Sequence, residues 1–169
     1  MKVALTGAIQ VGKSTILKKV IAAAGAQIGG FFTVSRQRDD GYLDVFIIPA
    51  DNLDAPCSET NRIGIRLLKG NYVASPEAFE TVGCDILDAA VGKQLVVMDE
   101  LGMMENLAPH FQAKVLQILN GGQDAIMVVK PRHTAFLDSV RAVPGLVIKE
   151  VTMENRDQVC REVLDLFTK

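Results

Sequence analysis

The chain has 169 residues, of which 49% are hydrophobic and 22% are charged, and its formal net charge is −2. This length favours a single domain spanning residues 1–169, and the slightly acidic balance argues against nucleic acid or an anionic membrane as a partner. No apolar run approaches the ~20 residues of a membrane span and the short apolar start is not a signal peptide, so we expect a cytoplasmic protein.

The chain opens with a strand, a glycine-rich loop and a helix. Residues 2–6 form a short apolar run, residues 7–15 read GAIQVGKST, and residues 14–24 form a helical run. The phosphate-binding P-loop pattern G-x-x-x-x-G-K-[ST] is filled by Gly7, Gly12, Lys13 and Ser14. Its glycines let backbone N–H groups surround phosphates, and the helix N-terminus adds its positive dipole end. A plain glycine turn is the alternative, but the motif requires this strand and this helix.

Each part of the predicted loop has a chemical role. The Lys13 ammonium can reach the β- and γ-phosphates, and the Ser14 hydroxyl can be a ligand of Mg²⁺ carried by the nucleotide. The residues expected to bind the nucleotide here are Gly7, Ala8, Ile9, Gln10, Val11, Gly12, Lys13, Ser14 and Thr15. We infer no other metal, because Cys57, Cys84 and Cys160 lack metal-ligand spacing with one another or with the two histidines.

Two strand-like runs follow the first helix, at residues 27–36 and 42–49, separated by polar residues that end in Asp-Gly. Five or six polar residues between two apolar runs predict a β-hairpin with a longer loop. Arg36 and Arg38 border this loop. They either reach phosphate as an arginine finger or are simply solvated loop charges.

The rest of the chain alternates strands and helices. Ser75-Pro76-Glu77 predicts a helix start, with a hydroxyl N-cap, a proline in the first turn and an acid at the positive dipole end. The expected elements are a loop at 51–61, a strand at 63–68, a helix from 75 to 90, a strand at 94–100, a helix at 107–120, a strand at 125–129, a helix at 135–141, a strand at 146–151 and a helix at 154–167. This alternation predicts an α/β fold, a three-layer P-loop NTPase sandwich whose mostly parallel sheet is flanked by helices, with the β-hairpin inserted after the first helix.

A second part of a nucleotide site lies at residues 94–100, which read QLVVMDE. A continuous apolar run is typical of a strand buried on both faces, and ligands of open α/β sheets bind at the C-terminal ends of strands. Asp99 is therefore expected to hold Mg²⁺ through water, and Glu100 to orient and polarise a water in line with the γ-phosphate. The alternative is that Asp99 caps the next element and Glu100 is merely exposed.

Three further groups have two interpretations each. Residues 130–133 follow a buried strand, where a cation can stabilise transferred charge or cap a surface helix. Asn155 and Arg156 follow the last strand and can stack on or bond the base, unless Asn155 caps the final helix. The methionines at 98, 103 and 104 fit core packing better than a binding face.

The segments GAIQVGKST, GGFFTVSRQ, GNYVASPEAFE, LVVMDELGMME and VTMENRD follow in this order. In this order the chain resembles the small nucleoside-triphosphatases first described from thermophiles and called cancer-related nucleoside-triphosphatase in vertebrates. The resemblance runs from Lys2 to about Val163, and the DExGxME and ENRD segments are its specific part. It implies slow Mg²⁺-dependent hydrolysis of several NTPs to NDP and phosphate, with little base preference. The chain departs from the family at Ile9-Gln10, where a Pro-Gly pair is usual, and at Met103, where a lysine is frequent.

The sequence therefore favours a nucleoside triphosphatase that is a monomer or a weak homo-oligomer. Lys13 binds phosphate, Ser14 and Asp99 hold Mg²⁺, and Glu100 activates water. A small-molecule or nucleotide kinase shares the loop but needs an acceptor pocket and usually an arginine-rich lid, and neither is evident in residues 107–144. A GTP-binding switch or assembly protein would carry an Asn/Thr-Lys-x-Asp motif, whereas the corresponding strand ends in VKPR.

Overall fold

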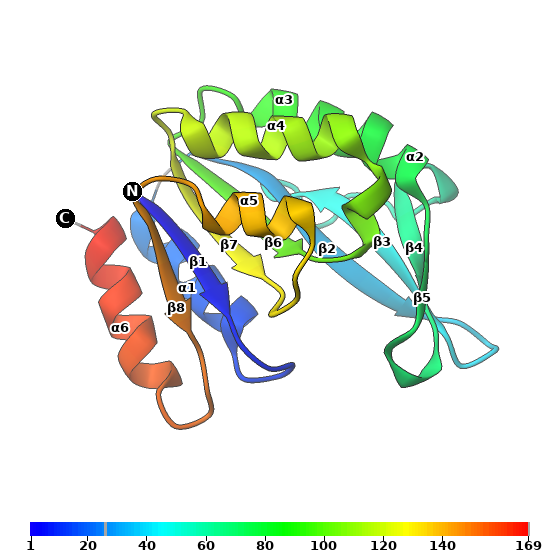
Figure 1. The fold of residues 1–169 in the computed structure, drawn as a ribbon, viewed down its shortest axis with the longest axis horizontal. Coiled ribbons are helices and arrows are strands. Elements are labelled where there is room, and N and C mark those ends of the chain that lie inside the picture. Colours follow the sequence, from blue (N-terminus) through cyan, green and yellow to red (C-terminus); the bar gives the residue numbers. More distant parts are fainter. Residues whose placement is uncertain (26, 169) are drawn as a thin grey trace.

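The computed structural model describes residues 1–25 and 27–168, and these residues form an eight-stranded sheet (Figure 1). Its strands are β1 (Lys2–Thr6), β2 (Ile28–Gln37), β3 (Leu43–Pro49), β4 (Arg62–Arg66), β5 (Tyr72–Ala74), β6 (Leu95–Leu101), β7 (Asp124–Val129) and β8 (Leu146–Glu150). The order across the sheet is β5-β4-β3-β2-β6-β7-β1-β8.

The helices occupy both faces of this sheet, as the alternating sequence pattern predicts. They are α1 (Lys13–Ala24), α2 (Pro76–Ala78), α3 (Cys84–Ala90), α4 (Pro109–Asn120), α5 (Ala135–Arg141) and α6 (Arg156–Phe167). A π-helical turn over Phe79–Gly83 joins α2 to α3, so residues 76–90 form the helical segment expected after Ser75. Short 3₁₀ turns lie at Glu59–Asn61, Leu68–Gly70 and Met104–Leu107.

The sheet combines a parallel part with an antiparallel extension. β2, β6, β7, β1 and β8 run parallel to their neighbours in that series, while β3, β4 and β5 continue from β2 as an antiparallel meander. The predicted hairpin is thus β2–β3, and the predicted α/β fold is confirmed. β5 is the strand that the pattern did not indicate, because its three residues are mostly exposed and too few to show alternation.

Two hydrophobic layers fill the space between sheet and helices. On one face, α3, α4 and α5 pack over a layer in which the Phe111 ring lies 5.6 Å from the Phe31 ring and 4.9 Å from the Phe79 ring. On the other face, α1 and α6 pack through residues such as Leu17 and Val163 (Figure 1). Both faces of the central strands are therefore buried, which accounts for their unbroken apolar runs.

This topology brings three strand ends to one edge. β7 lies between β1 and β6, so the C-terminal ends of all three parallel strands meet at the same side of the sheet. The loop after β1 and the end of β6 are separated by two strand spacings, about 10 Å. Within the described residues, no helix combines the length and apolar character needed to cross a membrane.

Candidate active site

The loop between β1 and α1 has the backbone conformation that its glycines permit. Gly7 has φ 131° and Gly12 has φ 103°, both in the region that side chains disfavour. At Gly7 there is also no space, because a Cβ would lie 2.3 Å from the carbonyl oxygen of Val151. The loop therefore depends on glycine at these two positions for the turn that leads into α1.

Gln10 adopts a left-handed conformation, with φ 63°, although it is not a glycine. It stands at the second position of the Pro-Gly pair that the resemblance leads one to expect. The neighbouring Ile9 is 85% exposed, so the tip of the loop projects into solvent. The chain keeps this turn at a conformational cost of about 1–2 kcal/mol for the Cβ of Gln10.

The Lys13 side chain is folded into the loop. Its Nζ donates to the carbonyl oxygen of Gly7 at 2.9 Å and to that of Ala8, and the residue is 8% exposed. Burial lowers the pKa of the Lys13 ammonium, while the nearby carboxylates of Glu100 and Asp99 act in the opposite direction. The cation is thus held at the centre of the loop, facing the two acids at the end of β6.

Ser14 and Asp99 are brought close together, although they are far apart in the chain. The Asp99 carboxyl is 8% exposed, and the Ser14 hydroxyl lies near enough to act on its pKa. Burial, and then the charge of Glu100, raise the pKa of Asp99 to about 6, against the effects of Ser14, Lys18 and Lys13. A buried carboxylate beside a hydroxyl is a pair of hard oxygen donors, which suits Mg²⁺.

The hydroxyl of Ser14 and the carboxylate of Asp99 would supply only part of the coordination shell of a metal ion. Within residues 1–25 and 27–168, no three or more His, Cys, Asp or Glu side chains are grouped so as to hold a metal ion by themselves. Magnesium usually keeps several waters and phosphate oxygens in nucleotide sites, so a hydroxyl and one carboxylate are enough from the protein. The residues present therefore fit a metal that arrives with the nucleotide.

Glu100 lies where the ladder between β6 and β7 is irregular. The register shifts between Asp99 and Leu101, so Glu100 has no partner residue on β7. Its Oε1 is 3.1 Å from Nζ of Lys130, which follows β7. The cation expected at residues 130–133 therefore contacts the proposed base directly.

Glu105 supports the turn that carries this pair. It is 2% exposed, its carboxylate accepts a hydrogen bond from the backbone N–H of Gly102, and burial raises its pKa to about 7. A Cβ at Gly102 would lie 2.9 Å from Cδ of Lys130, so the lysine stem lies directly on this glycine. The Gly and Glu of the DExGxME segment thus have structural roles beside the strand end.

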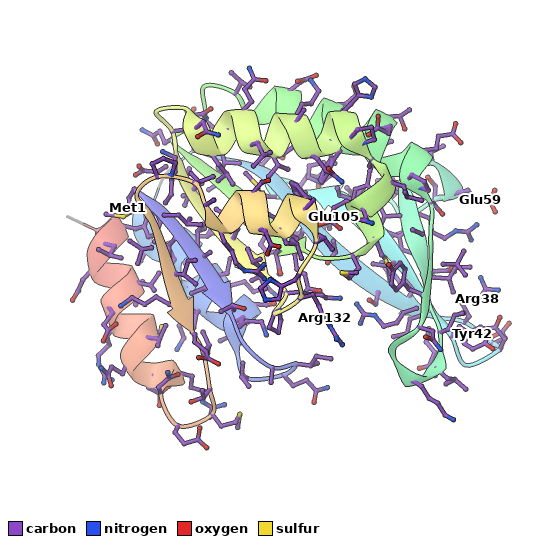
Figure 2. The ribbon with its side chains drawn as sticks, viewed as in Figure 1. Met1, Arg38, Tyr42, Glu59, Glu105 and Arg132 are labelled. Atoms are coloured by element: carbon purple, nitrogen blue, oxygen red, sulfur yellow. The ribbon has the colours of Figure 1, made fainter. Side chains whose placement is uncertain are left out.

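A cleft of about 740 Å³, a size typical of small-molecule sites, is lined by the P-loop, Glu100 and Lys130, whereas the buried Asp99 and Glu105 do not line it. Figure 2 shows Glu105 and Arg132 close to the ends of the central strands. The residues that line the cleft are Gly7, Ala8, Ile9, Gln10, Gly12, Lys13, Ser14, Thr15, Arg66, Gly70, Tyr72, Glu100, Met103, Met104, Val128, Lys130, Pro131 and Arg132. The structure therefore brings the predicted loop, Glu100 and the cations after β7 into one site.

The arginines expected as finger candidates do not line this cleft. Arg38 forms ion pairs with Asp40 at 2.9 Å and with Asp44 at 3.1 Å, and Figure 2 shows it at the outer end of the hairpin. Arg36 is exposed on the same hairpin. The arginine of the antiparallel extension that does line the cleft is Arg66, at the end of β4. Sequence reasoning missed it, because only the folded meander brings this strand end opposite the P-loop.

Asn155 and Arg156 differ in position relative to the loop. Oδ1 of Asn155 accepts from the N–H of Thr152 at 2.8 Å, and its Nδ2 donates to the carbonyl of Glu150 at 3.0 Å. The Asn155 amide therefore closes the turn before α6. Arg156 extends along the P-loop, since a Cβ at Gly12 would lie 3.7 Å from its Cδ.

Comparison with known proteins agrees with this geometry. The sequence profile of the NTPase family matches residues 2–164. The chain belongs to this family. It is 28% identical over 165 residues to nucleoside-triphosphatase THEP1 of Thermotoga petrophila, covering 97% of this chain and 91% of the relative. It is 26% identical to the cancer-related nucleoside-triphosphatase homolog of Bos taurus, covering 95% and 93%.

Solved structures of this NTPase family share the fold. The crystal structure of THEP1 from Aquifex aeolicus superimposes with a TM-score of 0.77 at 26% identity, over 100% of both chains. The solution structure of a human cancer-related nucleoside triphosphatase gives 0.71 at 23% identity, over 98% and 96% of the chains. The fold and the family resemblance predicted from the motifs are both confirmed, and family membership places the chain among the nucleoside-triphosphatases.

Proposed function

We propose that this chain hydrolyses several nucleoside triphosphates to the diphosphate and phosphate, depends on Mg²⁺, and has little preference for the base. The observation that carries the proposal is the single cleft that Lys13, Ser14 and Glu100 line together. It places the P-loop opposite the end of β6, where the buried Asp99 precedes Glu100. Phosphate binding, metal binding and a base are thus within one site.

The protein groups divide the chemistry among them. Bound Mg²⁺ would neutralise charge on the β- and γ-phosphate oxygens, and Ser14 and Asp99 would hold it. The loop amides and the positive end of α1 bind the phosphates, and Lys13 exchanges its two carbonyl contacts for phosphate oxygens. Glu100 orients water toward the γ-phosphate and accepts its proton.

Tolerance of different bases is supported by the residues after β8. The Asn155 amide is held by backbone groups through both its oxygen and its nitrogen, and Asn155 does not line the cleft, so no amide is aimed at the edge of a base from this position. Arg156 lies beside Gly12, where its planar guanidinium can stack on any base. Stacking contributes affinity without distinguishing one base from another.

Phosphate release tests this function. The purified chain would be assayed with ATP, GTP, CTP and UTP separately, with Mg²⁺ or with EDTA, and without any added acceptor. We expect kcat/KM values within about two decades, or about 2.7 kcal/mol, of one another. Release should be lost in EDTA and strongly reduced in Lys13→Ala. A larger preference for one base would contradict broad use, and no release without an acceptor would contradict hydrolysis.

A further inference from the structure

The cleft extends well beyond the residues needed for a triphosphate. One wall is the P-loop, and the facing wall comes from the β4–β5 hairpin and the loop after β6. Arg66 and Tyr72 are register partners on β4 and β5, and Met103 follows β6. Arg156 lies beside the P-loop on the side of α6. If the base of a bound triphosphate stacks on Arg156, that base lies away from the facing wall and leaves the facing wall open.

The cleft carries positive charge both on the facing wall and in the loop after β7, and ion pairs with acids neutralise only part of it. Arg66, Lys130 and Arg132 line the cleft, and among the described residues only Lys130 of these three forms an ion pair, with Glu100. The other arginines of the antiparallel extension behave differently. Arg38 pairs with two aspartates, and Arg62 lies 3.5 Å from Asp44 and 3.8 Å from Glu59. Two guanidinium groups in one cleft suit a phosphate group, which they bind in a bidentate geometry.

The same wall has a fixed apolar part. The Tyr72 hydroxyl donates to the carbonyl oxygen of Met103 at 3.4 Å, which ties β5 to the loop after β6. Met104 packs beneath it on β4, where a Cβ at Gly64 would lie 3.1 Å from its Sδ. An aromatic ring and two thioethers beside guanidinium groups form a surface on which a flat ring can stack.

We propose that this half of the cleft, lined by Arg66, Tyr72, Met103 and Arg132, is a second subsite that binds a nucleoside monophosphate while a triphosphate occupies the P-loop. The inference rests on the proposed function for the occupant of the P-loop. A polynucleotide is disfavoured because the chain has a net charge of −2. The sequence showed no acceptor pocket for a second substrate in residues 107–144. In this proposal such a pocket is formed mainly by residues outside that range, namely Arg66, Tyr72 and Met103.

Calorimetry with the protein saturated by Mg²⁺ and the non-hydrolysable ATP analogue AMPPNP tests the subsite. AMP would be the probe, with adenosine and inorganic phosphate as controls that carry only the ring or only the phosphate. We expect AMP to bind the loaded protein at least about tenfold more tightly than either control. Arg66→Gln and Arg132→Gln should each weaken AMP by about tenfold while changing AMPPNP affinity less than about twofold.

Arg38→Gln is the matched control, because this arginine lies outside the cleft and should leave AMP binding unchanged. Arg132 is exposed, so its variant keeps the test valid even if Arg66→Gln folds poorly. Displacement of AMPPNP by AMP, or AMP binding that neither variant weakens, would overturn the subsite. So would inorganic phosphate binding as tightly as AMP. Failure of AMPPNP itself to bind would overturn the proposed function and this inference with it, whereas AMPPNP binding without AMP overturns the subsite alone.

Discussion

Nζ of Lys130 lies 3.1 Å from Oε1 of Glu100, so the proposed base and a cation share one edge of the cleft. Glu100 lies near the end of β6 and Lys130 follows the neighbouring parallel strand β7, and the lysine stem lies against Gly102. This arrangement holds a positive charge where the γ-phosphate would face Glu100. A fixed cation at that point stabilises charge that develops on the transferred phosphoryl group.

Replacing Lys130 tests this role. Lys130→Met retains the stem on Gly102 and removes the charge. We expect single-turnover hydrolysis to slow by about 10- to 100-fold, or about 1.4 to 2.7 kcal/mol, with nucleotide affinity changed little, because the cation acts mainly on the transition state. Lys149→Met is the control, since Lys149 pairs with Glu162 at 2.7 Å outside the cleft. Equal rates in the two variants would remove Lys130 from the mechanism.

Glu100→Gln preserves the shape of the side chain and removes the base. Loss of general-base action typically slows a reaction by about 10²–10⁴-fold, or about 2.7–5.4 kcal/mol of barrier, and we expect this for single-turnover hydrolysis. Nucleotide affinity should hardly fall, because the lost interaction belongs to the transition state. Hydrolysis within about threefold of wild type would exclude Glu100 as the base, and Glu105 would become the next candidate.

Asp99→Asn should behave differently, because the buried Asp99 lies near Ser14 at the end of β6 and is the proposed metal ligand. The amide is a weaker ligand for a hard cation, so the Mg²⁺ concentration needed for half-maximal activity should rise and nucleotide binding should weaken together with turnover. Titration of Mg²⁺ beside a binding isotherm measures both effects. If the Mg²⁺ concentration for half-maximal activity is the same in Asp99→Asn as in wild type, Asp99 is not a ligand of the metal.

Gln10→Gly should stabilise the fold. Gln10 has φ 63°, a conformation that costs a residue with a Cβ about 1–2 kcal/mol, and glycine adopts it freely. After the larger entropy of glycine in the unfolded chain, we expect a net gain of about 0.5–1 kcal/mol in the free energy of unfolding, or about 1–4 °C in Tm. Ile9→Gly, at an exposed neighbour without positive φ, should lower Tm instead. If thermal denaturation shows Tm changing in the same direction in both variants, the strain assigned to Gln10 is contradicted.

Glu105 should make stability depend on pH. Burial raises its pKa to about 7, whereas an unfolded glutamate titrates near ~4.3, so the folded state keeps its proton to higher pH. This contribution is fully present below about pH 4 and is lost as the pH rises through 7, on the order of 4 kcal/mol in the free energy of unfolding. Glu105→Gln keeps an acceptor for Gly102 and cannot ionise. Urea denaturation at pH 5 and pH 8 measures the free energy of unfolding of both proteins, and the variant should be more stable relative to wild type at pH 8 than at pH 5. The same difference in stability between variant and wild type at both pH values would contradict the titration of a buried Glu105.

The features predicted correctly are those that neighbouring residues specify. The nine residues 7–15 contain the glycines, the lysine and the hydroxyl of the P-loop. The motif and its flanking strand and helix can therefore be predicted from the sequence without knowledge of the fold. The apolar run before Asp99 likewise shows a buried strand and its end. Strand β5 was not predicted, because its three mostly exposed residues are too few to show an alternation of apolar and polar positions. The two interpretations of Asn155 could not be separated either, since its amide bonds to the backbone of Glu150 and Thr152, and only the folded turn brings these groups to it.

The contacts of the site were decided by the tertiary structure. The sequence by itself determined the α/β pattern, the phosphate loop and the acids that end β6, because hydrophobic periodicity and glycine conformations are local properties. It could not show that Lys130 meets Glu100, or that Arg66 and not Arg38 lines the cleft. Those pairings depend on the order of strands in the sheet, and hence on long-range packing that brings distant strand ends to one edge.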